Sequence, residues 1–405
     1  MTPILKFPKI PPLALYIHLP WCVKKCLYCD FNSHEVGRNT VREQEYVDAL
    51  IRDLEFELPR VWGRRIISIF IGGGTPSLFS PEALEHLLNA LHARLNFHPD
   101  IEITLEANPG TAEAEKFKAY RELGINRLSI GVQSFNDEKL QSLGRIHGSD
   151  EAKAAISMAH DAGFKNINID LMFGLPNQTI SEALNDLQIA NDQGPTHISW
   201  YQLTIEPNTV FYSRPPKLPD EDHIWDMQQE GQQLLAEKGF LQYEISAYAQ
   251  HQHQCMHNLN YWQFGDYLGI GAGAHGKITD VGKGTITRYA RHRIPESYLQ
   301  KSGTESVITE TRQLTRDDVV LEFMMNALRL NEGVYPPLFN ERTGLPLTAA
   351  QDQLHQAEAR NFIEWNIETL KPTDSGRRYL NELLQLFLID EADKSPPVRH
   401  FVSGN

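Results

Sequence analysis

The chain has 405 residues, of which 41% are hydrophobic and 22% charged, and its formal net charge is −14 at pH 7. This composition is ordinary for a globular protein and supplies enough apolar side chains for a large core. The acidic balance argues against a protein that wraps a nucleic-acid backbone, which needs a basic surface, so we expect no nucleic-acid partner.

The N-terminal residues contain no charged leader followed by a long apolar run, so we expect no export signal. No apolar stretch approaches the roughly 20 residues that cross a bilayer. Four cysteines do not make a disulfide framework, and three of them lie within eight positions. We therefore expect a cytoplasmic protein whose clustered cysteines bind a metal.

Short strand patterns alternate with amphipathic helical patterns from residue 13 to about residue 250. The strand candidates are LALYIHLP, IISIFIGGG, EITLEANP, RLSIGVQS, INIDLMFG and HISWYQLTIEP, with YEISAYA as a possible seventh. Strands that alternate with helices pair in parallel through right-handed crossovers. The sequence therefore predicts an α/β fold with a partial parallel (β/α)6 barrel over residues 1–250.

Glycines and polar residues gather where these predicted strands end. The first strand leads into the cysteines and the second ends in Gly72-Gly73-Gly74, while later strands carry Glu106, Gln133, Asp170 and Glu206. The carboxyl ends of barrel strands form the active face of such folds. Loops are polar in any case, but so many polar residues at one end favour a cofactor pocket.

The pattern changes after residue 250. Residues 251–300 are rich in His, Gly and aromatic residues and are interpreted as a connecting segment that contains HNLNYW. Residues 301–390 predict a small, mostly helical C-terminal domain, with the stretch FIEWNIETLKPTDSGRRYL as a candidate hairpin before the last helix. Residues 391–405 have charge, two prolines and no periodicity, which is typical of a disordered tail.

Cys22, Cys26 and Cys29 have CxxxCxxC spacing, which leaves three chemistries open. Structural zinc usually takes four ligands, often as two separated pairs, and no second pair is nearby. A redox site of the thioredoxin kind needs only CxxC. Three thiolates on an iron–sulfur cubane leave one iron free to bind a substrate.

The motifs YIHLPWC, CLYCDF, IFIGGGTPSL, LEANPGT, RLSIGVQSF, LGRIHG, NIDLMFGLP and HNLNYW together resemble the radical S-adenosylmethionine (SAM) superfamily. Within it they resemble the coproporphyrinogen-dehydrogenase-like branch, and most closely its haem-chaperone group, over nearly all of residues 13–385. The resemblance implies a 4Fe–4S cluster on Cys22, Cys26 and Cys29, with SAM chelated to the fourth iron.

The resemblance also implies a set of SAM contacts. Glycine lets the backbone approach the ligand closely, carboxylates suit ribose hydroxyls, and an Arg fork suits the SAM carboxylate. A polar network that closes the barrel mouth is the competing structural explanation for any one of them. The implied SAM residues are Tyr16, Tyr28, Gly72, Gly73, Gly74, Thr75, Glu106, Gln133, Arg145 and Asp170, with Thr204 as a further matching position.

Two functions from different classes follow. One is an oxygen-independent coproporphyrinogen III dehydrogenase that decarboxylates propionates with a SAM-derived radical; the other is a carrier that hands haem to an acceptor protein. Phe31 stands where the dehydrogenases have a further cysteine, only 21 residues precede Cys22, and HNLNYW matches the HNxxYW signature of the chaperones. These departures favour the carrier.

A haem carrier needs an axial ligand and a flat apolar wall. His257 is the candidate ligand, with Tyr261 and Trp262 as the wall and Cys255 as an alternative thiolate. Without the resemblance, His257 capping a turn beside core aromatics is the simpler interpretation. His275 in GIGAGAHG lies in a loop that either faces a flat ring or only turns the chain. The acceptor is open, and a membrane-associated haem enzyme, docked transiently, is one candidate.

Overall fold

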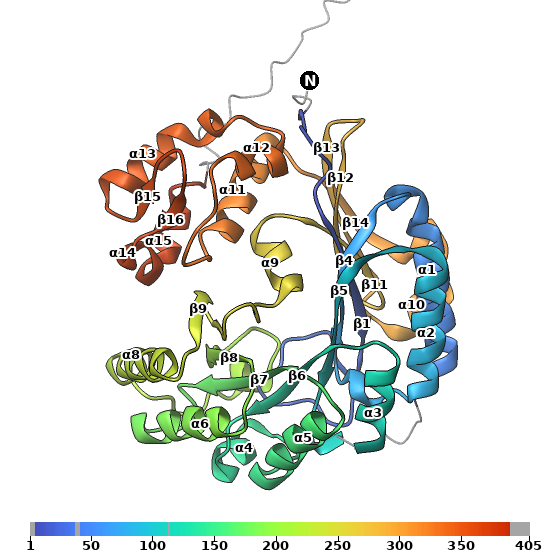
Figure 1. The fold of residues 1–405 in the computed structure, drawn as a ribbon, viewed down its shortest axis with the longest axis vertical. Coiled ribbons are helices and arrows are strands. Elements are labelled where there is room, and N and C mark those ends of the chain that lie inside the picture. Colours follow the sequence, from blue (N-terminus) through green and yellow to red (C-terminus); the bar gives the residue numbers. More distant parts are fainter. Residues whose placement is uncertain (1–4, 37–40, 112–113, 389–405) are drawn as a thin grey trace, which may run out of the picture.

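Six parallel strands, each followed by helix on the outer side of the sheet, form the first part of the fold (Figure 1). The computed structural model describes residues 5–36, 41–111 and 114–388. The six strands are β1 Leu13–Leu19, β4 Arg65–Gly73, β5 Asn96–Ala107, β6 Arg127–Gln133, β7 Asn166–Phe173 and β8 His197–Gln202. The helices are α1 Glu43–Val61, α2 Pro81–Arg94, α3 Ala114–Glu122, α4 Asp137–Leu143, α5 Ser149–Asp161, α6 Ile180–Asp192, α7 Val210–Ser213 and α8 Glu221–Glu237. The predicted partial (β/α)6 barrel is confirmed.

Local sequence explains these elements. Every residue of β1 except Tyr16 is buried, as expected for a parallel strand covered on both faces. Helix α2 starts as its sequence predicts, because the Ser80 side chain accepts a hydrogen bond from the Ala83 amide and Pro81 occupies the first helical position. The helices and strands enclose the main hydrophobic core.

Residues 251–300 do not merely connect two domains, as the sequence analysis expected. They form helix α9 Met256–Trp262 and helix α10 Pro295–Lys301, together with strands β11 Asp266–Ile270, β12 His275–Asp280 and β13 Thr285–Arg291. Strand β11 pairs in parallel with the free edge of β1, and β12, β13 and β14 Ile308–Gln313 extend the sheet with antiparallel pairing. The barrel sheet thus continues well past residue 250, and the predicted helical region begins with a strand.

The candidate seventh strand YEISAYA forms two short strands at the other edge. Strands β9 Leu241–Glu244 and β10 Ala247–Ala249 pair with each other, and β10 pairs with β8, all antiparallel. The complete sheet therefore has twelve strands, in the order β14-β13-β12-β11-β1-β4-β5-β6-β7-β8-β10-β9.

The C-terminal helices gather beside one end of the sheet, and α9 lies between them and the inner face (Figure 1). Their core includes Leu5 from the N-terminal segment and Ile286 from β13. The predicted hairpin is present as β15 Ile363–Trp365 and β16 Leu370–Pro372. The helices are α11 Arg316–Ala327, α12 Pro337–Thr343, α13 Gln351–Ala359, α14 Asp374–Arg378 and α15 Leu380–Gln385.

The predicted disordered tail, residues 391–405, lies outside the described residues. Within the described part of the chain, no helix combines the length and the apolar character needed to span a membrane.

Candidate functional site

The cysteine loop leaves the carboxyl end of β1 and is anchored on three sides. Its first part forms β2 Trp21–Cys22, which pairs with β3 His34–Glu35. The amide of Thr75, just after β4, donates a hydrogen bond to the Trp21 carbonyl at 2.7 Å. The amide of Leu27 donates to the Leu143 carbonyl, at 3.1 Å. The loop is therefore held over the end of the parallel strands.

The glycine run lets β4 approach this loop. A Cβ added to Gly74 would lie 2.4 Å from the Trp21 carbonyl oxygen, and one added to Gly73 would lie 2.7 Å from the His18 ring. Gly73 also has a φ of 123°, which disfavours residues with a Cβ. In this structure the glycines therefore serve the packing of the cysteine loop against the strand.

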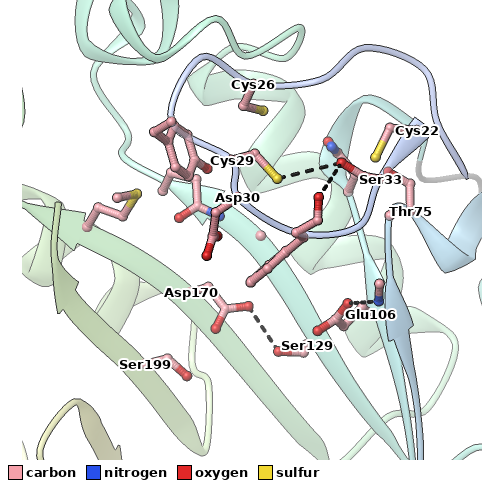
Figure 2. Close-up of a pocket in the computed structure, with 18 of the residues that line it drawn as sticks. Cys22, Cys26, Cys29, Asp30, Ser33, Thr75, Glu106, Ser129, Asp170 and Ser199 are labelled. Carbon is pink, nitrogen blue, oxygen red and sulfur yellow. Dashed lines mark hydrogen bonds between the residues drawn. The ribbon is translucent and has the colours of Figure 1, made fainter. Parts of the chain in front are cut away.

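Cys22, Cys26 and Cys29 are free thiols that line one cavity (Figure 2). Burial raises the pKa of the Cys22 and Cys29 thiols above the ordinary range. The Arg145 guanidinium donates a hydrogen bond to Sγ of Cys26 at 3.4 Å. Because thiolates are the form that binds metal, loading this loop would release protons.

Three cysteine thiols that line one cavity are suitable ligands for an iron–sulfur cubane. In the described ranges, no three His, Cys, Asp or Glu side chains converge as one metal ion requires. A zinc ion needs every ligand within about 2.0–2.3 Å of one centre. In a 4Fe–4S cluster each thiolate binds a different iron, so the three thiols surround the group instead of meeting at a point.

The cavity below the cysteine loop has a volume of about 550 Å³, in the range of small-molecule sites. It brings together residues of five of the six parallel strands, β4 to β8, and of the cysteine loop. The residues predicted from the sequence that line it are Cys22, Cys26, Cys29, Tyr28, Gly73, Gly74, Thr75, Glu106, Gln133, Arg145, Asp170, Thr204 and Glu206. Tyr16 and Gly72 do not line it. Tyr16 lines a neighbouring cavity, where its hydroxyl lies 2.9 Å from Nδ1 of His18, and Gly72 lines neither cavity.

Two half-buried carboxyl groups, Glu106 and Asp170, face this cavity from β5 and β7 (Figure 2). The pKa of Glu106 is raised to about 8, mainly by burial and also by the nearby charge of Asp170, while the Gly73 amide, which donates to Oε2 at 2.9 Å, opposes the shift. Burial also raises the pKa of Asp170 above its ordinary value. Both groups therefore hold protons more tightly than exposed carboxyls do.

The polar floor of the cavity is not among the features predicted from the sequence. Oγ of Ser129 donates to Asp170 at 2.9 Å, and Nδ2 of Asn168 donates to the other oxygen of Asp170 at 2.8 Å. The Tyr201 hydroxyl donates to Oε1 of Gln133 at 2.8 Å. The sequence did contain a signal for these residues. Ser129 and Asn168 each lie on a predicted strand, where every second side chain points to the same face of the sheet.

A second cavity, of about 690 Å³, adjoins the first and shares Phe31, Gly73 and Glu106 with it. Its lining residues come from the sheet, from helix α9 and from helix α11. The cavity therefore lies between the barrel and the C-terminal helices. Its walls are rich in aromatic and cationic side chains. They include Tyr261, Trp262, Phe264, Tyr267, His275, Lys277, Arg288, Arg293 and Met325.

Comparison with known proteins shows which family this chain belongs to. The model of the Radical SAM superfamily matches residues 16–190, and that of the HemN C-terminal domain matches residues 314–379. Heme chaperone HemW of Haemophilus influenzae is 52% identical over 95% of this chain and 100% of its own length. The Escherichia coli protein of the same name is 50% identical over 94% of this chain and 100% of its own length. The chain belongs to the HemW family.

Among solved structures, the coproporphyrinogen III oxidase HemN from Escherichia coli, titled a radical SAM enzyme, has a TM-score of 0.77. The match covers 93% of this chain and 90% of that chain at 24% identity. At this identity the likeness shows a shared fold and no more.

The HNxxYW motif of this HemW-family chain divides between the two cavities and the interior. Asn258 lines the cysteine cavity, and Tyr261 and Trp262 line the second cavity. His257 is only 1% exposed and lines neither. Its Nδ1 lies 3.0 Å from Oγ of Ser68 and its Nε2 lies 3.0 Å from the Tyr261 hydroxyl.

These contacts bear on the predicted haem ligands. Burial lowers the pKa of His257 to about 3, so its ring is neutral and both nitrogens are occupied by hydrogen bonds. Cys255, the alternative thiolate, is fully buried with Sγ 3.5 Å from Oε1 of Glu102, and burial raises its pKa to about 12. In this conformation neither side chain reaches a cavity.

Proposed function

We propose that this protein is a haem chaperone, which binds haem and passes it to an acceptor protein, and that it carries a 4Fe–4S cluster and SAM. The observation that carries the proposal is the similarity along nearly the whole chain to proteins named Heme chaperone HemW. The second cavity, with its aromatic and cationic walls, supports it because haem has a flat apolar ring and two carboxylates.

The three cysteines would hold the cluster, and the cavity below them would hold SAM. The cluster, when bound, supplies the electron that radical cleavage of SAM needs. Tyr28 provides an aromatic surface beside the thiols, and the carboxyls of Glu106 and Asp170 bind hydroxyl groups of the ligand. Arg145, beside Cys26, brings a fixed positive charge to the carboxylate end of the ligand.

The competing function is the oxidative decarboxylation of coproporphyrinogen III, since the fold is shared with HemN. Phe31 argues against it. Its side chain is 61% exposed and lines both cavities, at the position where the dehydrogenases are expected to have a further cysteine. An apolar ring at this boundary suits a surface that receives a flat porphyrin.

The test is anaerobic and runs two assays on the cluster-reconstituted full chain. Haem is titrated by difference spectroscopy, and coproporphyrinogen III is incubated with SAM and a reductant. Saturable haem binding of about one haem per chain without porphyrinogen decarboxylation is the expected result. Decarboxylation with multiple turnovers and no stoichiometric haem binding would replace the chaperone with the dehydrogenase.

A further inference from the structure

The position of the haem within the proposed chaperone is not settled by the HNxxYW motif, because His257 has no free ring nitrogen. Axial coordination needs a nitrogen lone pair that can face the iron. If His257 coordinated the iron, it would lose its hydrogen bonds to Ser68 and Tyr261. Its side chain, now only 1% exposed, would also have to leave the protein interior. A histidine that already faces a cavity is a better candidate.

Two histidines line the second cavity, and they differ in one respect. His18 is occupied at both nitrogens, since Nδ1 lies 2.9 Å from the Tyr16 hydroxyl and Nε2 lies 2.9 Å from the Asn32 carbonyl. The ring of His275 is exposed and has no hydrogen-bond partner among the described residues. His275 is therefore the imidazole in this cavity that is free to bind a metal.

The walls around His275 match the other parts of haem. Tyr261 and Tyr267 form an edge-to-face pair with ring centroids 4.6 Å apart. Met325 of α11, which is 46% exposed, lines the same cavity from the C-terminal helices. A flat apolar ring would fill the gap between these aromatic side chains and the methionine.

The cations of the cavity are not equally free. Lys277 is buried and paired with Asp266 at 3.1 Å. Arg288 donates to Glu322 at 2.6 Å and to the Tyr267 hydroxyl at 2.6 Å. Arg293 is exposed and forms no ion pair within the part of the chain that the structure describes. Arg293 is therefore the guanidinium available to a carboxylate.

The turn that carries His275 is tied to the cysteine loop. Nδ2 of Asn32 donates to the carbonyl of Ala272 at 2.9 Å and to the carbonyl of Arg293 at 2.8 Å. Asn32 follows the last cysteine by three residues. One side chain thus fixes both the histidine turn and the backbone of the free arginine to the loop that holds the thiols.

We propose that haem binds in the second cavity with His275 as its axial ligand and Arg293 pairing with a propionate. This inference rests on the proposed haem-chaperone function and specifies where the cargo sits. Tyr261, Trp262 and Met325 pack against the porphyrin ring, and His257 acts only by positioning Tyr261.

The test compares haem titrations and absorption spectra of cluster-reconstituted, full-length variants under anaerobic conditions. His275→Ala is expected to weaken haem binding by at least about tenfold, since it removes a coordination bond, and to lose the histidine-ligated spectrum. Added imidazole is expected to restore that spectrum. His251→Ala, which removes an exposed histidine outside both cavities, is the matched control and should behave as the parent protein.

A second variant tests the propionate contact. Arg293→Gln should weaken binding of haem several-fold but leave binding of haem dimethyl ester unchanged, because the ester has no carboxylate. Equal losses for both ligands would overturn the role of Arg293. Binding and spectra of His275→Ala that match the parent would overturn the site alone. A parent protein that binds no haem saturably would overturn the chaperone function and the site with it.

Discussion

His257 is hydrogen-bonded through Nδ1 to Oγ of Ser68, 3.0 Å away, at the contact between helix α9 and strand β4. The amide of His257 also donates to Oε1 of Glu102 on β5 at 3.1 Å. The histidine of the HNxxYW motif therefore fastens α9 to two strands, and α9 in turn sets the positions of Tyr261 and Trp262 in the second cavity.

We expect His257→Ala to lower the free energy of unfolding by about 1–3 kcal/mol, because it leaves buried hydrogen-bonding groups of Ser68 and Tyr261 without their partner. Urea unfolding of the cluster-free protein, followed by circular dichroism, measures the change. His251→Ala on the exposed turn should stay within about 0.5 kcal/mol of the parent. Equal stabilities for the two variants would show that the interior hydrogen bonds are unimportant.

The cysteine loop makes a prediction about iron content. We expect each of the three substitutions Cys22→Ser, Cys26→Ser and Cys29→Ser to prevent stable cluster assembly, because in the proposed cluster each thiolate would hold a different iron. Cys255→Ala should keep the parent's iron and sulfide content, since this thiol is buried against Glu102, away from the loop. The readout is iron and inorganic sulfide per chain after anaerobic reconstitution. Loss of iron in Cys255→Ala would place a fourth ligand where the structure has none.

The raised pKa of Glu106 predicts that the free energy of unfolding depends on pH, and it fixes the sign of that dependence. The side chain titrates near 4.5 in the unfolded chain and near 8 in the folded one. As the pH rises between these values the unfolded state releases the proton first, so this group's contribution to stability is present below about pH 4.5 and is lost by about pH 8. The loss amounts to at most about 1.4 kcal/mol per pH unit.

Glu106→Gln removes this titration while keeping an oxygen that accepts from the Gly73 amide. In protein without cluster or SAM, we expect the variant to gain stability relative to the parent between pH 5 and pH 8. Urea unfolding at both pH values measures it, with Glu85→Gln on the exposed face of α2 as control. A parent–variant difference that is the same at both pH values would contradict a raised pKa.

The sequence predicts those parts of the fold that depend on nearby residues. Each β/α repeat is visible because its periodicity and caps lie within a few residues, as at Ser80. The pairing of β11 with β1 joins Leu13 to Asp266, and nothing local in a glycine-rich segment indicates that β1 has a free edge there. Residues 251–300 were therefore interpreted as a connector.

The same distinction holds for the site. The strand-end positions of Glu106, Gln133 and Asp170 follow from the strand pattern, and the structure brings all three to one cavity. The surroundings of His257 depend on Ser68, which lies 189 residues away in the sequence. Whether a histidine is free or hydrogen-bonded is decided by such distant partners, so the motif alone could not exclude it as a ligand.

Gly74 allows the contact between β4 and the cysteine loop to be tested directly. A Cβ at this position would lie 2.4 Å from the Trp21 carbonyl oxygen, which is a backbone atom and cannot rotate away. Gly74→Ala should therefore displace the loop and lower iron occupancy after reconstitution. Gly282→Ala is the control, because its added Cβ would meet nothing closer than 3.4 Å. Full iron occupancy in Gly74→Ala would show that the loop tolerates the shift.

The segment 251–300 is joined to the barrel by a buried ion cluster. Nε of Arg291 on β13 donates to Asp53 at 2.6 Å and Nη2 donates to Glu57 at 3.0 Å, both on α1, and all three side chains are fully buried. The Tyr298 hydroxyl also donates to Asp53, at 2.8 Å. Arg291 thus neutralises two carboxylates that have no access to water.

Arg291→Met should lower the free energy of unfolding by about 3–5 kcal/mol, because it leaves Asp53 buried without a counter-charge and leaves Glu57 with only the partly exposed Arg60, 3.3 Å away. Arg312→Met on β14 is the matched control: Arg312 also pairs with two carboxylates, Asp318 and Glu322, but its side chain is 47% exposed. Solvent screens that pair, so its loss should cost no more than about 1 kcal/mol. Adding Asp53→Asn and Glu57→Gln to Arg291→Met should recover much of the lost stability. Equal effects of the two arginine substitutions would mean that water reaches Asp53 and Glu57, and that the segment is less firmly joined to α1 than these contacts indicate.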